Sequence, residues 1–181
     1  MSAKRITRTA LMAVLTLLAG FIRIQLGPIP LTMQTLAVNL TALILPPLDA
    51  LMAMLVHLLL KFLIAGPEPF TLPSAGFLYG FVLAAWVGSL YLKSKTRTEP
   101  NTPTRLTALI LAATIPYLVG LPYMTYHLNV VMGMNNGLAE ILQLGVIPFI
   151  PGDILKIILA DLIGQRLIRQ IRYEQNAPWE K

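Results

Sequence analysis

Cysteine is absent from this chain of 181 residues, and charged residues are scarce. The lack of cysteine excludes disulfide bonds, thiolate metal sites and a cysteine nucleophile. Charged residues make up 12% of the sequence, about half of the ~25% that is usual in soluble domains. Hydrophobic residues reach 56%, which is more apolar surface than a soluble domain could hide. The composition therefore predicts one integral membrane domain over residues 1–181, with no room left for a soluble catalytic domain.

Motifs for hydrolytic chemistry are missing as well. The phosphate-binding pattern Gly-x-x-x-x-Gly-Lys-Ser/Thr does not occur, so we do not expect this chain to hydrolyse ATP itself. A Gly-x-Ser-x-Gly turn for a serine hydrolase is also absent. The only histidines, His57 and His127, lack partners at the spacing of metal ligands, so packing roles are expected for both. We therefore expect no enzymatic activity, no metal site and no cofactor.

Six apolar segments of roughly helical length follow one another along the chain. They cover Thr9–Leu26, Met33–Leu45, Leu48–Ala65, Ala75–Leu92, Leu106–Leu121 and Asp153–Arg169. A transmembrane helix needs ~20 apolar residues, and fewer where protein covers part of it. The pattern predicts an all-α integral membrane bundle of six helices with ordered outer loops. The mixed segment Asn129–Pro151 is expected to form an ordered loop with one re-entrant or surface helix.

The basic residues indicate how these helices are oriented. Most of the 14 lysines and arginines precede the first segment, follow the fourth or close the chain: Lys4, Arg5, Arg8, Lys93, Lys95, Arg97, Arg105, Arg166, Arg169, Arg172 and Lys181. With six helices, all of these positions fall on one side, which the positive-inside rule makes the cytoplasmic side of a bacterial plasma membrane. Both termini are then expected in the cytoplasm. This distribution explains the net charge of +6 without any binding to nucleic acid.

Three loops on the opposite side are rich in proline and glycine and contain neither lysine nor arginine. They read Gly27-Pro-Ile-Pro-Leu-Thr32, Gly66-Pro-Glu-Pro-Phe-Thr71 and Gly145-Val-Ile-Pro-Phe-Ile-Pro151. Proline fixes the backbone, and glycine permits conformations that other residues avoid. This combination suits loops that cover a bound ligand better than loops that only connect two helices. The sequence therefore predicts a ligand site at the outer end of the bundle.

Several polar side chains near this end are candidate ligand contacts. Gln34 directly follows the first loop, and Asp153 opens the last helix with Lys156 three residues later. Asp153 and Lys156 can pair with each other, and the helix dipole favours a carboxylate in a first turn. Capping and ligand binding are both open for Asp153, as are ligand contact and helix–helix hydrogen bonding for Gln34.

The other charges within the apolar segments have simpler explanations. Arg23 and Lys61 lie near the outer ends of the first and third segments, so each is expected to extend to the membrane interface. Asp161 can pair with Lys156 or make an interhelical contact. Two stripes of small residues, at four-residue or similar spacing, either pack inside the bundle or dock a partner subunit: Thr9, Ala13, Thr16 and Gly20, and Gly76, Gly80, Ala84 and Gly88.

Three stretches of the chain resemble the BioY family. They are Pro30-Leu-Thr-Met-Gln-Thr-Leu-Ala-Val38, Pro73-Ser-Ala-Gly-Phe-Leu-Tyr-Gly-Phe81 and Pro148-Phe-Ile-Pro-Gly-Asp-Ile-Leu-Lys156, and the Pro-Gly-Asp-x-x-Lys pattern in the last is the most specific. BioY proteins are the biotin-binding S components of energy-coupling-factor (ECF) transporters. The resemblance implies a six-helix bundle that binds biotin near its outer face. It also implies delivery by toppling in the membrane, while docked to a transmembrane coupling subunit and two cytoplasmic ATPases.

The same resemblance implies a set of substrate-binding residues, namely Gln34, Ser74, Gly76, Phe77, Asp153 and Lys156. Asp153 would accept hydrogen bonds from the ureido N–H groups of biotin, and Phe77 would pack on the ring system. Lys156 or a backbone nest would bind the valerate carboxylate. An S component for a different vitamin and a structural membrane subunit without a ligand are the alternative interpretations.

Overall fold

A computed structural model describes residues 2–25, 27–95 and 100–175, with side chains up to residue 171. Some sequence predictions therefore lie outside the described residues: the end of the first segment at Leu26, the basic residues Arg97 and Lys181, and the side chain of Arg172. Everything below concerns the described part of the chain.

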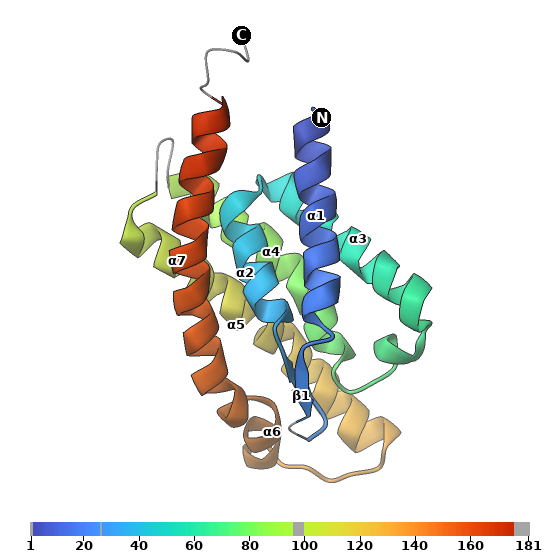
Figure 1. The fold of residues 1–181 in the computed structure, drawn as a ribbon. Coiled ribbons are helices and arrows are strands. Elements are labelled where there is room, and N and C mark those ends of the chain that lie inside the picture. Colours follow the sequence, from blue (N-terminus) through green and yellow to red (C-terminus); the bar gives the residue numbers. More distant parts are fainter. Residues whose placement is uncertain (1, 26, 96–99, 176–181) are drawn as a thin grey trace.

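Six long helices and one short helix form the described bundle. They are α1 (Ala3–Ala19), α2 (Gln34–Ile44), α3 (Pro47–Ala65), α4 (Ala75–Lys95), α5 (Thr102–Tyr126), the short α6 (Leu138–Gly145) and α7 (Ile150–Gln175). The α1 helix begins, and α7 ends, at one end of the bundle, whereas the β1 region and α6 lie at the other (Figure 1). The all-α prediction is confirmed, and so is the single helix expected between residues 129 and 151.

Three of these helices are long and apolar enough to cross a membrane. They are α3, α4 and the stretch Thr102–Val131, in which α5 continues into a π-helical turn, η2 (His127–Val131). The α2 helix is apolar but shorter. Many large apolar side chains point outward, among them Leu59, Phe62 and Leu63 of α3. Such an apolar exterior is stable in lipid, and the chain is a membrane protein.

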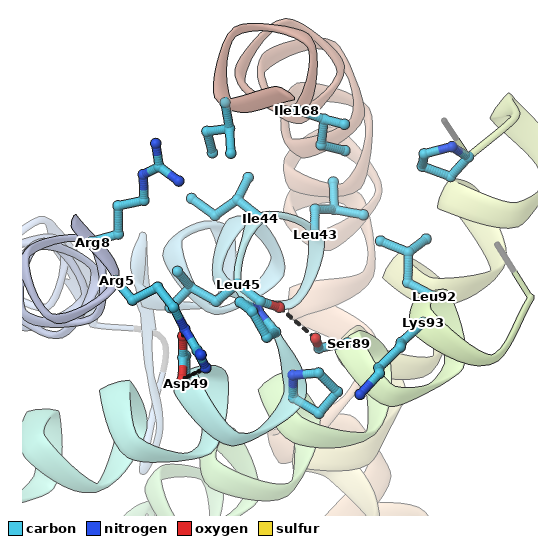
Figure 2. A pocket seen from close by; sticks show the side chains of 14 residues that line it. Arg5, Arg8, Leu43, Ile44, Leu45, Asp49, Ser89, Leu92, Lys93 and Ile168 are labelled. Carbon is cyan, nitrogen blue, oxygen red and sulfur yellow. Dashed lines mark hydrogen bonds and ion pairs between the residues drawn. The ribbon is translucent and has the colours of Figure 1, made fainter. Parts of the chain in front are cut away.

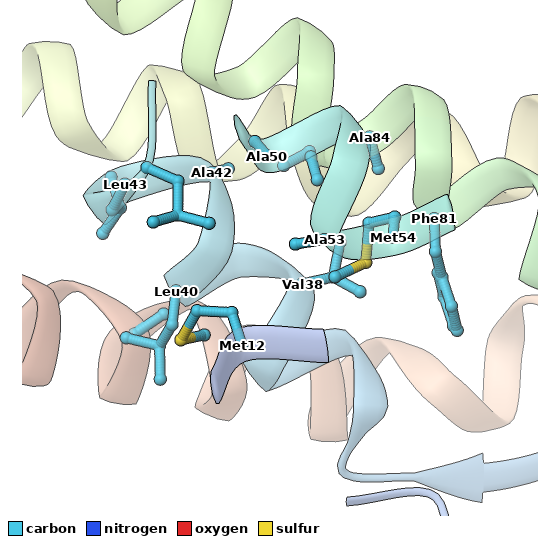
Figure 3. Close-up of a cluster of buried hydrophobic side chains, with 14 of the residues drawn as sticks. Met12, Val38, Leu40, Ala42, Leu43, Ala50, Ala53, Met54, Phe81 and Ala84 are labelled. Carbon is cyan, nitrogen blue, oxygen red and sulfur yellow. The ribbon is translucent and has the colours of Figure 1, made fainter. Parts of the chain in front are cut away.

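The core of the bundle lies where α2 crosses the neighbouring helices. Met12 of α1, Val38 of α2, Met54 of α3 and Phe81 of α4 belong to one buried cluster (Figure 3). Three residues of the small stripe predicted on the first helix are buried against α2 and α3, namely Thr9, Ala13 and Thr16, whereas the fourth, Gly20, follows the end of α1 and is half-buried. This stripe is therefore an internal packing surface.

The small stripe on α4 packs internally too. A Cβ atom added to Gly80 would lie 2.7 Å from the Cα of Pro116 in α5, and one added to Gly88 would lie 3.0 Å from the Cβ of Ala42 in α2. Contacts this short leave no room for a larger residue. The glycines thus let the backbones of α4 and α5 approach closely, as small residues do in membrane helix pairs.

The first helix is shorter than the predicted segment Thr9–Leu26. The α1 helix ends at Ala19, and the chain then forms an antiparallel hairpin of β1 (Arg23–Gln25) and β2 (Pro30–Thr32). Gly27, between the strands, has a φ of 93°, which is accessible to glycine at little cost. Prolines at positions 28 and 30 cannot continue a helix, so the chain turns back before entering α2.

The fifth helix is longer than the predicted segment Leu106–Leu121. It starts at Thr102, reaches Tyr126 and includes Pro122 in its interior. Proline is tolerated within membrane helices because neighbouring helices and local adjustments satisfy the freed backbone groups.

Asp161 makes the interhelical contact rather than pairing with Lys156. Its Oδ1 lies 2.7 Å from Nε of Arg105, which also donates from Nη1 to the carbonyl oxygen of Pro100 at 2.9 Å. The two charged side chains expose only 6% and 14% of their surface, so this is a buried ion pair between α5 and α7.

Candidate ligand-binding site

Two cavities adjoin at the hairpin end of the bundle. The larger has a volume of about 330 Å³ and the smaller about 50 Å³. They share one wall, which consists of Ile29, Pro30, Thr32, Phe77 and Phe81. Small-molecule sites usually measure ~300–1,000 Å³, whereas one water molecule takes up ~30 Å³. The larger cavity therefore has the size of a small-molecule site, and the smaller one holds only a water or a small polar group.

The larger cavity collects side chains from elements that are distant in the sequence. Gln34 at the start of α2, Ser74 just before α4 and Phe77 in the first turn of α4 all line it, and their contact with a ligand stays a prediction. Arg23 of the hairpin and Lys61 of α3 line the same cavity. Polar groups thus meet an aromatic face, which is the usual composition of a site for an amphipathic small molecule.

Gln34 is buried and hydrogen-bonded on two sides. Its Nε2 lies 3.0 Å from Nε2 of His57 in α3, and its backbone N–H donates to Oγ1 of Thr32 at 3.3 Å. His57 is itself fully buried, so its packing role is confirmed. Gln34 therefore makes the helix–helix hydrogen bond that its sequence position allowed, and it borders the cavity; its contact with a ligand stays a prediction.

Asp153 and Lys156 line the smaller cavity as an ion pair. Nζ of Lys156 lies 3.2 Å from Oδ1 of Asp153, which confirms the pairing predicted from their spacing. The hydroxyl of Tyr117 in α5 donates a hydrogen bond to Oδ2 of the same carboxylate. A carboxylate offers about four lone-pair positions, so Asp153 can still accept hydrogen bonds from a ligand. Beside this group, Oγ1 of Thr35 is buried and has no hydrogen-bond partner among the described residues.

Tyr117 is one residue of this site that the sequence did not reveal. Its ring meets that of Phe77 edge-on, with the centroids 5.8 Å apart and the planes at 90°. The Asp153 that accepts its hydrogen bond lies 36 positions further along the chain. A tyrosine within an apolar helix gives no sign of so distant a partner.

Gly76 lines neither cavity. A Cβ atom at this position would lie 2.5 Å from the Cβ of Tyr123, and one at Gly120 would lie 2.5 Å from Cγ of Phe77. The two glycines let α4 and α5 approach each other and make room for the Phe77 ring. Direct contact between Gly76 and a ligand stays a prediction.

A further cavity lies at the opposite end of the bundle, where α1 begins. It measures about 370 Å³, and Figure 2 shows its walls of leucine, isoleucine and proline with a few charged side chains. Arg5 donates two hydrogen bonds of 2.8 Å to the carboxylate of Asp49 there. Ser89 donates to the carbonyl oxygen of Leu45, which fixes the end of α2 against α4. None of the predicted ligand contacts lies in this cavity, so we place the candidate site at the hairpin end.

Metal chemistry finds no support in the part of the chain that the structure describes. No group of three histidine, aspartate or glutamate side chains is placed there to hold a metal ion. The polar groups of the site are hydrogen-bond donors and acceptors around an aromatic ring.

Comparison with known proteins agrees with this description. The model of the BioY family matches residues 1–173. The probable biotin transporter BioY of Bacillus subtilis is 31% identical over 90% of this chain and 87% of its own length. The biotin transporter BioY of Thermotoga maritima is 24% identical over 91% of this chain and 95% of its own. The crystal structure of an S-component for biotin from an ECF-type ABC transporter superposes with a TM-score of 0.80, covering 93% of this chain and 95% of that one at 22% identity. The last likeness shows that the two share a fold.

Proposed function

Because this chain belongs to the BioY family, we propose that it is a membrane-embedded subunit that captures biotin at the hairpin end of its bundle. The main support for the proposal is the 330 Å³ cavity, which is lined by Gln34, Ser74 and Phe77. This cavity adjoins the smaller one that contains the Asp153–Lys156 pair. Relatives that match most of the chain are biotin transporters, which supports the choice of ligand.

The chemistry of biotin fits these groups. Its ureido ring carries two N–H donors and one carbonyl acceptor, so it needs both acceptors and donors from the protein. Asp153 accepts hydrogen bonds, while the Gln34 amide and the Ser74 hydroxyl can both donate and accept. The face of Phe77 packs on the apolar part of the bicyclic ring. Lys156 completes the site by donating a hydrogen bond to Oδ1 of Asp153, which orients that carboxylate.

Biotin is too large for the smaller cavity, in which Asp153 lies. We therefore place the ring system in the larger cavity, with its polar edge toward the shared wall. Contact with Asp153 requires that the Phe77 side chain shift so that the two cavities join. Such a side-chain shift on binding is common even where the backbone of a site stays in place.

Uptake of biotin then needs an energy source outside this chain. The sequence lacks a phosphate-binding loop, so we propose that the protein works with an ECF coupling subunit and two cytoplasmic ATPases. In this arrangement the hairpin end faces the outside of a bacterial plasma membrane. The end at which α1 begins and α7 ends, where most basic residues gather, faces the cytoplasm.

Equilibrium binding to the purified protein in detergent tests the ligand. We expect saturable binding of biotin with a stoichiometry of about one, and no comparable binding of riboflavin or thiamine. Preferential binding of riboflavin or thiamine would instead support an S component for a different vitamin. Folded protein that binds none of the three would contradict the proposal and support a structural subunit.

A further inference from the structure

We propose that Arg23 and Lys61 together bind the carboxylate of the ligand, so that the charged tail of biotin points toward α3 and away from Lys156. This inference rests on the proposed function, because it assigns one end of the same ligand. It gives a binding role to two residues that the sequence alone placed at the membrane interface.

The hairpin brings the two cations to one cavity. Arg23 lies on β1 and is exposed, whereas Lys61 lies near the end of α3 and is half-buried. Both line the 330 Å³ cavity next to Gln34 and Ser74. Arg23 reaches this position because the first helix ends at Ala19 and the chain then forms the hairpin, whereas Lys61 is placed by α3.

The cavity carries an excess of positive charge. Glu68 also lines it, so two cations face one carboxylate. Within the described ranges, no carboxylate lies within 4.0 Å of the charged group of Arg23 or Lys61. Neighbouring like charges repel, and a bound anion relieves that repulsion while donors on both residues satisfy its oxygens. The chemistry of this part of the cavity is therefore that of a site for a monocarboxylate.

Lys156 is the less suitable partner for the ligand carboxylate. Its ammonium group already lies 3.2 Å from Asp153, and that pair borders a cavity of only about 50 Å³. A second carboxylate placed there would meet the negative charge of Asp153. With the tail at Arg23 and Lys61, the ureido ring at the other end of the ligand faces the shared wall and Asp153, which matches its N–H donors to an acceptor.

A comparison of charged and neutral ligands tests the assignment. Biotin carries the carboxylate, whereas biotin methyl ester and biotinamide keep the ring and the chain without the charge. The wild-type protein is expected to bind biotin about tenfold or more tightly than either neutral ligand, as follows from the loss of one hydrogen-bonded charge pair. The variants Lys61→Met and Arg23→Gln should each lose most of this preference, because their affinity for biotin falls more than their affinity for the neutral ligands. Lys61→Arg should keep the preference.

Lys93→Met is the matched control, because Lys93 is exposed and lines the cavity at the other end of the bundle. It should behave as the wild type does. The inference is wrong if Lys61→Met and Arg23→Gln both keep the full preference for biotin, or if the wild type binds biotin and its methyl ester equally. In both cases biotin still binds, so the proposed function stands. Wild-type protein that binds no form of biotin would instead refute the proposed function itself.

Discussion

The buried ion pair between Arg105 and Asp161 allows a prediction about stability that is independent of the ligand. Replacing Asp161 by asparagine removes the negative charge beside the almost fully buried Arg105 guanidinium, which keeps only neutral acceptors: the asparagine oxygen, the Pro100 carbonyl and the Thr102 hydroxyl. Removing one member of a buried pair costs ~3–5 kcal/mol, because the other charge stays buried without compensation. For a protein of this size, 1 kcal/mol corresponds to ~2–4 °C in Tm, so a loss of 3 kcal/mol corresponds to about 6–12 °C.

Thermal unfolding in detergent measures this effect. Asp161→Asn should lower the Tm by about 6–12 °C, whereas Arg166→Gln, at an exposed position of the same helix, should change it by less than about 2 °C. The double variant Arg105→Met with Asp161→Leu should recover most of the loss, because apolar side chains can replace a buried pair at little cost. Biotin affinity should be unchanged in all of them, since the pair borders the end of the bundle opposite the hairpin. The reasoning would be refuted if Asp161→Asn were as stable as Arg166→Gln, or if the double variant were the least stable of the set.

Three further predictions concern the site, the packing and the orientation. Asp153→Asn should weaken biotin binding about tenfold or more, measured by titration calorimetry, because the hydrogen bonds of a charged acceptor are lost; unchanged affinity would remove Asp153 from the site. Gly80→Ala should lower the Tm by several degrees because its Cβ would lie 2.7 Å from the backbone of α5, whereas Gly137→Ala has open space and should be neutral; equal effects would contradict the close packing. In the cysteine-free background, a membrane-impermeant maleimide should label Glu68→Cys but not Ser94→Cys in intact cells, and the opposite result would reverse the proposed orientation.

Most of the helical architecture could be predicted because its determinants are local. Apolar length, basic flanks and turn residues are read from neighbouring positions, and the prediction of six helices with one short helix in the last loop is confirmed. The Asp153–Lys156 pair was predictable for the same reason, since three positions on one helix fix its geometry. The hairpin was missed because strands of three residues each carry too little pattern to stand out from the end of an apolar segment.

The remaining parts of the site depend on how the helices pack. Tyr117 meets Asp153 across 36 positions of sequence, and Arg105 meets Asp161 across 56. Arg23 and Lys61 share a cavity only because the hairpin folds back toward α3. These contacts are set by helix crossing geometry rather than by local composition, so no pattern along a single segment indicates them.

The glycine contacts between α4 and α5 give the candidate site one rigid side. Phe77 and Tyr117 stand on these two helices, whose backbones are too close to slide without a clash. Arg23 and Ser74, in contrast, come from the hairpin and from the loop before α4, which are tied to the bundle by short turns. In the proposed site, entry and release of a ligand then require movement of the hairpin, the loops and the Phe77 side chain against an α4–α5 wall whose backbone stays in place. Substitutions on the wall should consequently alter which ligand is accepted, whereas substitutions in the hairpin and loops should alter how fast it comes and goes.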